Sequence, residues 1–179
     1  ALPISHRDIA EERLDYWLKP EKEAEINFDI RFGWTAAPYF INSYRSGETE
    51  LVDVLHRQGI AVGFFFFERA AAVSPEAAEA LDRTIIEDFR GMLSETAPGA
   101  ASVVGEAFSE RRCYVEVMLW DSDRVFEAVQ NWSSQASNVR AAAFRSYRRP
   151  AGILFFKSGD RSKNASDAGD AADEADEVS

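Results

Sequence analysis

An eight-residue apolar run, IAVGFFFF at Ile60–Phe67, constrains the fold of this chain more than any other feature. Its side chains are apolar at both parities, and successive side chains of a β-strand point to opposite faces of the sheet. A strand of this kind is covered on both faces. The run is also far shorter than the roughly 20 residues of a membrane helix. The sequence therefore predicts a central strand with packed layers on both sides, and no membrane association.

The segments that follow this run predict the order strand, helix, strand, strand, helix, strand over residues 60–147. The first helix begins at Ser74 and Pro75, an N-cap followed by proline at the first helical position. The other expected elements are a hairpin of strands 101–108 and 112–120, a helix capped by Asp121, a strand over 139–147 and a short apolar strand over 153–156. This order predicts an α+β fold of the ferredoxin-like βαββαβ type, with both helices on one face of an antiparallel sheet.

Residues 5–59 predict an N-terminal layer of helix and hairpin. A helix is expected from Ser5 to Pro20, and alternation over 25–34 predicts a half-buried strand. Residues 39–44 predict a weaker strand that pairs with the strand over 25–34 as a hairpin. Leu51–Arg57 predict a short helix. An alternative stays open, in which strand 39–44, helix 49–58 and strand 60–67 close a βαβ unit of their own. The chain would then contain two tandem half-units.

The strand expected over Arg112–Trp120 is apolar on both sides. One parity, the face expected under the two helices, holds Cys113, Val115, Val117 and Leu119. The other parity holds Tyr114, Glu116, Met118 and Trp120. A bare patch of large apolar side chains is unusual on a monomer, so the second face needs a cover. We expect the strand over residues 26–34 and its neighbours to fold over this face, and the alternative is a homo-oligomer whose second subunit packs on it.

The net charge of −11 is unevenly distributed. Residues 158–179 carry seven acids and two basic residues in a segment with almost no large apolar side chain, which predicts a disordered acidic tail after one domain over 1–157. An acidic protein repels nucleic acid and anionic membranes, so we expect neither as a partner. One cysteine, Cys113, and an N-terminal segment unlike a signal peptide favour a cytoplasmic location.

A resemblance to a known family covers residues 60–147, about half of the chain. It rests on GIAVGFFFF, the helix after SPEAAEALD, the hairpin VVGEAFSERRCYVEVMLWD and the helix beginning SDRVFEAV. These segments resemble the ferredoxin-like domains of bacterial proteins of the regulator of ribonuclease E activity B type and uncharacterised relatives. The resemblance implies a small acidic cytoplasmic protein that acts by binding another protein, without a cofactor. It carries over no functional residue.

No sequence motif points to a catalytic, metal or cofactor site. Nucleotide loops, nucleophile elbows and zinc-binding spacings do not occur. His6 and His56 have no recognisable partner, and the parity of Cys113 makes it a small core residue. Asp121 and Asp123 are expected from helix capping alone. The sequence therefore favours a non-enzymatic protein over an enzyme.

One local cluster of positive charge stands out. Residues 138–157 contain no acid and form what we term the cationic strip, which comprises Arg140, Arg145, Tyr147, Arg148, Arg149 and Lys157. Arg111 and Arg112 are expected to approach it from the hairpin turn. Bidentate arginine contacts would allow this surface to bind an acidic protein or another anionic partner. The alternative is that these arginines neutralise the chain's own acids or protect an edge strand.

Two further functions stay open. The first is a small enzyme with a pocket between the sheet and the N-terminal layer, lined by Trp34, Tyr39, Tyr114 and Trp120. Convergent polar groups in a deep pocket would favour this enzyme, whereas exposed arginines without a cavity would favour a binding protein. The second is an assembly subunit that uses the second face of the sheet as its interface.

Overall fold

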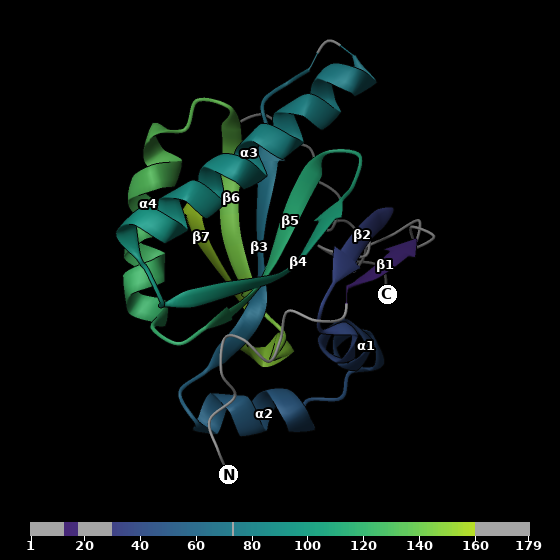
Figure 1. Ribbon diagram of the computed structural model, residues 1–179, viewed down its shortest axis with the longest axis vertical. Helices are drawn as coiled ribbons and strands as arrows, with labels where there is room; N and C mark the ends of the chain where they lie inside the picture. Colours follow the sequence, from purple (N-terminus) through teal and green to yellow (C-terminus); the bar gives the residue numbers. More distant parts are fainter. Residues whose placement is uncertain (1–12, 18–29, 73, 160–179) are drawn as a thin grey trace, which may run out of the picture.

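The computed structural model describes residues 13–17, 30–72 and 74–159. They form a mixed α+β fold with a seven-stranded antiparallel sheet and four α-helices (Figure 1). The strand order is β1-β2-β4-β5-β3-β6-β7. The elements are β1 (Leu14–Trp17), β2 (Phe32–Thr35), α1 (Pro38–Ser46), α2 (Glu50–Arg57), β3 (Ala61–Arg69), α3 (Pro75–Thr96), β4 (Ala101–Phe108), β5 (Arg112–Leu119), α4 (Ser122–Gln135), β6 (Val139–Ser146), a 3₁₀ turn (Arg149–Ala151) and β7 (Ile153–Lys157).

The apolar run forms β3, which lies inside the sheet between β5 and β6. Phe65 and Phe67 are fully buried under α3 and α4, and Phe64 and Phe66 are buried on the opposite face. The prediction of a central strand covered on both faces is confirmed. The four middle strands, in the order β4-β5-β3-β6, carry both long helices on one face.

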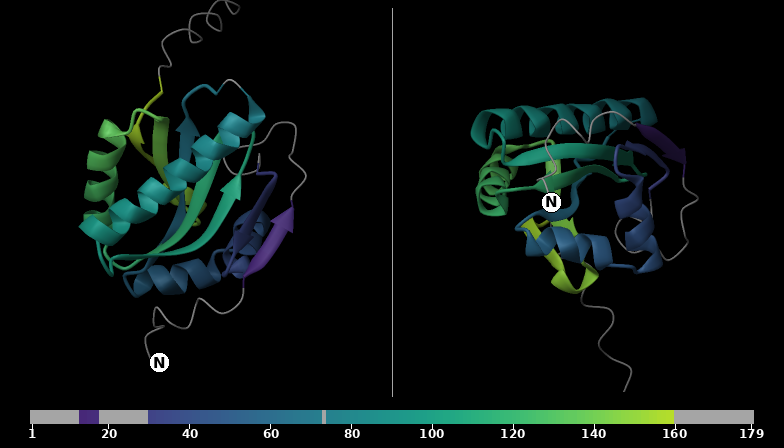
Figure 2. Two further views of the ribbon diagram at one scale, coloured as in Figure 1. Left: turned by 45° about the horizontal axis from the view of Figure 1, so that its top comes forward. Right: turned by 60° about the horizontal axis from the view of Figure 1, so that its bottom comes forward.

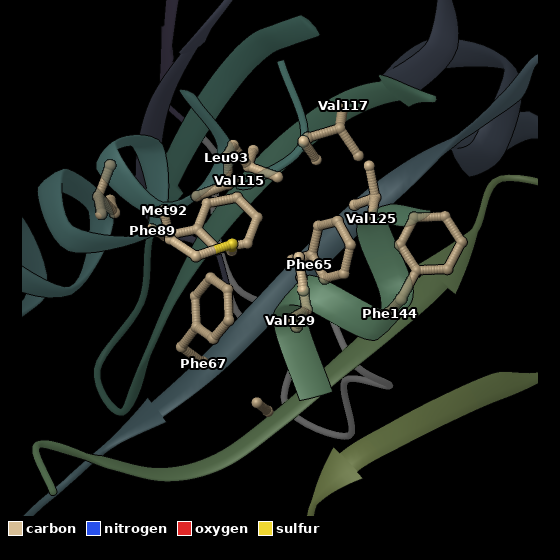
Figure 3. Close-up of a cluster of buried hydrophobic side chains, with 14 of the residues drawn as sticks. Phe65, Phe67, Phe89, Met92, Leu93, Val115, Val117, Val125, Val129 and Phe144 are labelled. Atoms are coloured by element: carbon tan, nitrogen blue, oxygen red, sulfur yellow. The ribbon is translucent and has the colours of Figure 1, made fainter. Parts of the chain in front are cut away.

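The layer of α3 and α4 follows the sequence pattern closely. The Ser74 hydroxyl accepts a hydrogen bond from the Ala77 amide, and Asp121 accepts one from the Arg124 amide, so both expected caps are present. Cys113, Val115, Val117 and Leu119 pack beneath the helices, as the parity of β5 predicts. Figure 3 shows Phe65, Phe67 and Phe89 in this apolar core.

The second face of the sheet is covered from within the chain, by α1 and α2. The right view of Figure 2 shows α3 on one side of the sheet and these two helices on the other. Tyr114 and Met118 are each 2% exposed. The cover comes from within the chain, as expected, but the strand expected to fold over this face does not do so, because β2 extends the sheet beside β4. This face is therefore not bare. A second subunit could pack on the sheet here only if the face were exposed.

Two predicted elements are wrong. Residues 39–44 lie in helix α1, where Pro38 occupies the first turn and Phe40, Ser43 and Tyr44 share one buried side. The short apolar run is ambiguous between strand and helix, and the helical spacing prevails because it buries these side chains against the sheet. Residues 14–17, expected in a helix, form edge strand β1.

Some predictions concern residues outside the described ranges. The remainder of the first expected helix, most of the alternating segment over 25–34 and residues 160–179 of the acidic tail lie outside the described residues. Among the described residues, no helix combines the length and the apolar character that a membrane crossing requires.

Candidate functional site

A carboxylic acid, Glu116, lies buried in the middle of β5 on the face covered by α1 and α2. Glu116 is 5% exposed and lies between two buried residues on the same face of the strand, Tyr114 and Met118. The two-residue period of the strand turns the carboxyl group away from solvent and into the core. A buried acid must find hydrogen-bond partners or remain neutral.

The Glu116 carboxyl has two hydroxyl partners from distant parts of the chain. The Thr35 Oγ1 atom at the end of β2 lies 2.6 Å from Glu116 Oε2, and the Tyr147 Oη atom after β6 lies 2.7 Å from Oε1. Thr35 Oγ1 also accepts a hydrogen bond of 2.9 Å from the Ala37 amide, immediately before α1. The carboxyl group therefore connects the start of α1 with the end of β6 through the sheet.

A glycine makes room for this carboxyl group. Gly105 in β4 lies opposite Glu116, beside a register shift in the ladder. A Cβ atom at this position would overlap Glu116 Oε2 and lie 2.7 Å from the Trp34 carbonyl oxygen. Because one obstacle is backbone, a side chain could not be accommodated by a simple rotation. The site as it stands requires glycine here.

The environment of Glu116 changes its acidity. Burial raises the pKa of its carboxyl group from 4.5 to about 7, although the hydrogen bonds of Thr35 and Tyr147 act in the opposite direction. Burial, together with the negative charge of Glu116, also raises the pKa of Tyr147 well above its usual value, and the same two causes raise the pKa of Tyr16. Glu116 is therefore the group in this cluster that exchanges a proton near neutral pH.

Both protonation states of Glu116 can be satisfied by the groups around it. When the carboxyl group is ionised, Thr35 and Tyr147 each donate a hydrogen bond to it. When it is protonated, it can donate to Thr35 Oγ1, whose own hydrogen can turn to the Val104 carbonyl oxygen at 3.4 Å. A hydroxyl group that reverses its role in this way allows a proton to enter or leave without an unsatisfied atom.

A small cavity adjoins the carboxyl group, between the sheet, β1 and α1. Its free space is about 20 Å³, enough for about one water molecule. Its lining combines aromatic and apolar walls with polar groups, from Tyr16, Ile30, Ile41, Arg45, Phe64, Glu106, Ala107, Tyr114, Glu116 and Tyr147.

The cationic strip does not form one surface. Arg140 lies near Glu68 (3.5 Å), and Arg148 pairs with Asp53 of α2 at 2.6 Å. Lys157 donates to the Ala136 carbonyl oxygen. Three further members of the strip differ in their surroundings. The Arg145 guanidinium lies 5.8 Å from the centre of the Tyr44 ring, Tyr147 is buried beside Glu116, and Arg149 belongs to the 3₁₀ turn.

Arg111 and Arg140 do come together, at a surface hollow beside the β4–β5 turn and the start of α3. Arg31 and Arg69 also line this hollow, but they pair with Glu110 and Asp82, each at 3.0 Å. Four acids in all line the same hollow as these four arginines, which balances the charge. Arg112 lies elsewhere, with its guanidinium 5.7 Å from the centre of the Phe66 ring.

Of the four residues expected to line a pocket between the sheet and the N-terminal layer, the cavity at Glu116 includes Tyr114 but not Trp34, Tyr39 or Trp120. Trp34 donates from Nε1 to Glu106 (3.0 Å), Tyr39 is 69% exposed, and Trp120 packs at the side of the second-face cluster. Sequence reasoning did not assign a function to Glu116. The available signal was an acid at an inward position of a strand whose other inward residues are apolar.

Comparison with protein-family models, with curated proteins and with solved structures finds no match for this chain. The resemblance to the regulator of ribonuclease E activity B type therefore stays a prediction. Within the described residues, no group of three or more histidine, cysteine, aspartate or glutamate side chains is placed to hold a metal ion. The chemistry of the site rests on the carboxyl and hydroxyl groups already described.

Proposed function

We propose that this protein is a small acid–base enzyme that binds a small molecule at the Glu116 cavity and exchanges a proton with it through Glu116. The observation that carries the proposal is the buried carboxyl group, held by two hydroxyl groups at the wall of a cavity between the sheet and the N-terminal layer. A general acid or base acts best when its pKa lies near the working pH, and burial raises that of Glu116 to about 7.

The surroundings of Glu116 support this role in two further ways. Tyr114 and Phe64 supply flat apolar walls that would orient a small molecule, while Tyr16 and Tyr147 supply hydroxyl groups. Because the free space holds about one water molecule, a larger ligand must displace side chains that line the cavity from β1, α1 or Ile30. Binding would then exclude water from the carboxyl group and strengthen its interactions.

The scaffold of this site is proposed to be a ferredoxin-like unit over residues 60–147. The strand order β4-β5-β3-β6 and the position of α3 and α4 on one face support it. Strands β1, β2 and β7 would then be additions at the two edges, and α1 and α2 an added layer. The added elements β1 and α1 contribute Tyr16, Ile41 and Arg45 to the lining of the cavity.

Proton uptake linked to ligand binding tests the proposed enzyme. A fragment library would be screened by NMR, and calorimetry of each hit in buffers of different ionisation enthalpy would count the protons exchanged. We expect hits that shift the NMR signals of Tyr16 and Tyr147 and change the protonation of the protein on binding. This proton exchange should be lost in Glu116→Gln. Glu106→Gln is the matched control, because Glu106 lines the same cavity while its carboxylate binds Arg90 and Trp34. Hits whose proton exchange survives in Glu116→Gln would contradict the proposal.

A second candidate is the binding of another protein through an acidic segment. Arg111 and Arg140 favour it, because they line one hollow from the β4–β5 turn and from β6, and both belong to the predicted cationic set. Arg111→Glu with Arg140→Glu would abolish capture of an acidic partner, and Arg148→Glu, outside the hollow, would leave capture unchanged. Loss of capture with Arg148→Glu alone would place the binding surface elsewhere.

A further inference from the structure

A groove separates α3 and α4 on the outer surface of the molecule, on the face opposite the Glu116 cavity. Figure 1 shows the two helices beside each other over the sheet. The groove encloses about 740 Å³. Its lining comes from Glu87, Asp88, Gly91, Met92, Glu95 and Thr96 of α3 and from Arg124, Glu127, Ala128, Asn131, Trp132 and Gln135 of α4.

The floor of the groove is apolar. Met92 and Ala128 are 8% and 9% exposed, so each presents a small part of its surface. Trp132 is partly buried, and its ring packs edge-to-face with those of Phe67 and Phe89 in the core. The floor is therefore continuous with the apolar core beneath the two helices.

The rim of the groove is acidic and uncompensated. Within the described parts of the chain, none of the carboxylates of Glu87, Asp88, Glu95 and Glu127 forms an ion pair, although Glu79 and Asp82 of α3 pair with Arg83 and Arg69. Arg124 is the single basic residue in the lining, and it donates to the Thr96 carbonyl oxygen. Arg90 of α3 turns away and pairs with Glu106. Such a rim attracts a positively charged partner.

Gly91 is an independent indication of a partner that approaches closely. It lies in the interior of α3, is exposed and lines the groove. A Cβ atom there would meet nothing within 4 Å, so packing inside this chain does not require glycine. Glycine in a helix interior is destabilising relative to alanine. The missing side chain leaves the groove open at this point.

We propose that the α3–α4 groove binds a basic amphipathic helix of a partner protein. Its lysine or arginine side chains would pair with the acidic rim while its apolar side rests on Met92, Ala128 and Trp132, the helix-in-groove mode of recognition. Close passage of the partner helix over Gly91 sets its position. The interaction is separate from the Glu116 cavity and does not depend on the proposed enzymatic activity.

The probe for this proposal is a synthetic peptide of about 18 residues, roughly five helical turns, in which lysine and leucine form an amphipathic helix. A second peptide with glutamate in place of lysine shows whether charge matters. Binding to the full chain would be measured by calorimetry and located by NMR. We expect the lysine peptide to shift signals of α3 and α4, and the glutamate peptide not to bind.

Two variants and one control separate groove binding from general attraction to an acidic protein. Glu95→Lys with Glu127→Lys should weaken the lysine peptide about tenfold or more. Glu48→Lys with Glu50→Lys makes the same change of net charge near α2 and should weaken it less than about threefold. Gly91→Gln should raise the melting temperature of the free protein and still weaken the peptide about tenfold, because its side chain fills the groove.

Three results would overturn the proposal. If the two double lysine variants weakened binding of the lysine peptide equally, the attraction would be non-specific. Unchanged binding to Gly91→Gln would show that the groove is not occupied. NMR shifts outside α3 and α4 would place the peptide on another surface.

Discussion

The two faces of the central sheet are built from the same strands but contain different chemistry. Toward α3 and α4, the core is a large apolar cluster with Phe65, Phe67 and Phe89 at its centre, and the buried polar residues of these helices are Ser133 and Asp82, which pairs with Arg69. Toward α1 and α2, the buried set includes Thr35 and Glu116 along with three tyrosines, Tyr44, Tyr114 and Tyr147. The first face stabilises the fold chiefly by apolar burial, whereas the second places an acid, Glu116, in the middle of a strand inside its core.

The difference has an energetic cost that the apolar face offsets. A buried Phe side chain contributes roughly 1.5–3 kcal/mol, while a buried acid is unfavourable unless it is hydrogen-bonded or neutral. Glu116 forms hydrogen bonds with two hydroxyl groups, and burial raises the pKa of its carboxyl group. A chain with one strongly stabilising face can retain such a group on the other, and functional sites are where such compromises are expected.

The largest expected effect comes from the apolar face. Phe89→Ala should destabilise the protein by about 3–5 kcal/mol, because Phe89 is fully buried and its ring lies about 5 Å from those of Phe65 and Phe67. Urea unfolding would measure it. Tyr39→Ala, at a side chain 69% exposed, is the control and should change stability within about ±0.5 kcal/mol. A midpoint unchanged by Phe89→Ala would mean that the two faces do not differ as described.

The next effect concerns pH and belongs to the second face. The pKa of Glu116 rises from 4.5 unfolded to about 7 folded, so the folded state holds the extra proton between these values. The resulting stabilisation is complete below pH 4.5 and is lost as the pH rises through 7, a change of about 3 kcal/mol. Unfolding free energies of wild type and Glu116→Gln, measured from pH 4 to pH 8, should differ by this pH-dependent amount. Parallel curves for the two proteins would show that Glu116 does not titrate in this range.

A smaller effect tests the space that Glu116 occupies. Gly105→Ala should destabilise by about 1–3 kcal/mol, because the new Cβ atom meets Glu116 Oε2 and the Trp34 backbone. Gly91→Ala, in the open groove on the other face, should instead stabilise by about 0.5–1 kcal/mol. Thermal unfolding of both variants would compare them, and equal effects would mean that the Glu116 site is not tightly packed.

The smallest effect concerns the cationic strip. Arg148→Ala breaks a partly exposed ion pair with Asp53 and should cost less than about 1 kcal/mol. Raising the salt concentration should reduce this cost further. A loss well above 1 kcal/mol in chemical denaturation would show that the pair holds α2 against the second face.

Local patterns predicted the elements around the apolar face with little error. The β3 run, the capped helix α3 and the β4–β5 hairpin follow from signals within a few residues. The errors at α1 and β1 fall on short segments, for which periodicity does not distinguish strand from helix. There the choice depends on which surface the segment meets.

By itself, the sequence determined that β3 is covered on both faces, that Cys113 belongs to the core, and that β5 carries Tyr114 and Glu116 on one side. These conclusions need only the two-residue period of a strand. The tertiary structure alone decided that Glu116 meets Thr35, 81 positions earlier, and Tyr147, 31 positions later. It also decided that Arg148 pairs with Asp53 instead of joining one exposed strip. The physical reason is that periodicity determines the direction of a side chain, whereas its partners depend on which distant segments the sheet brings together.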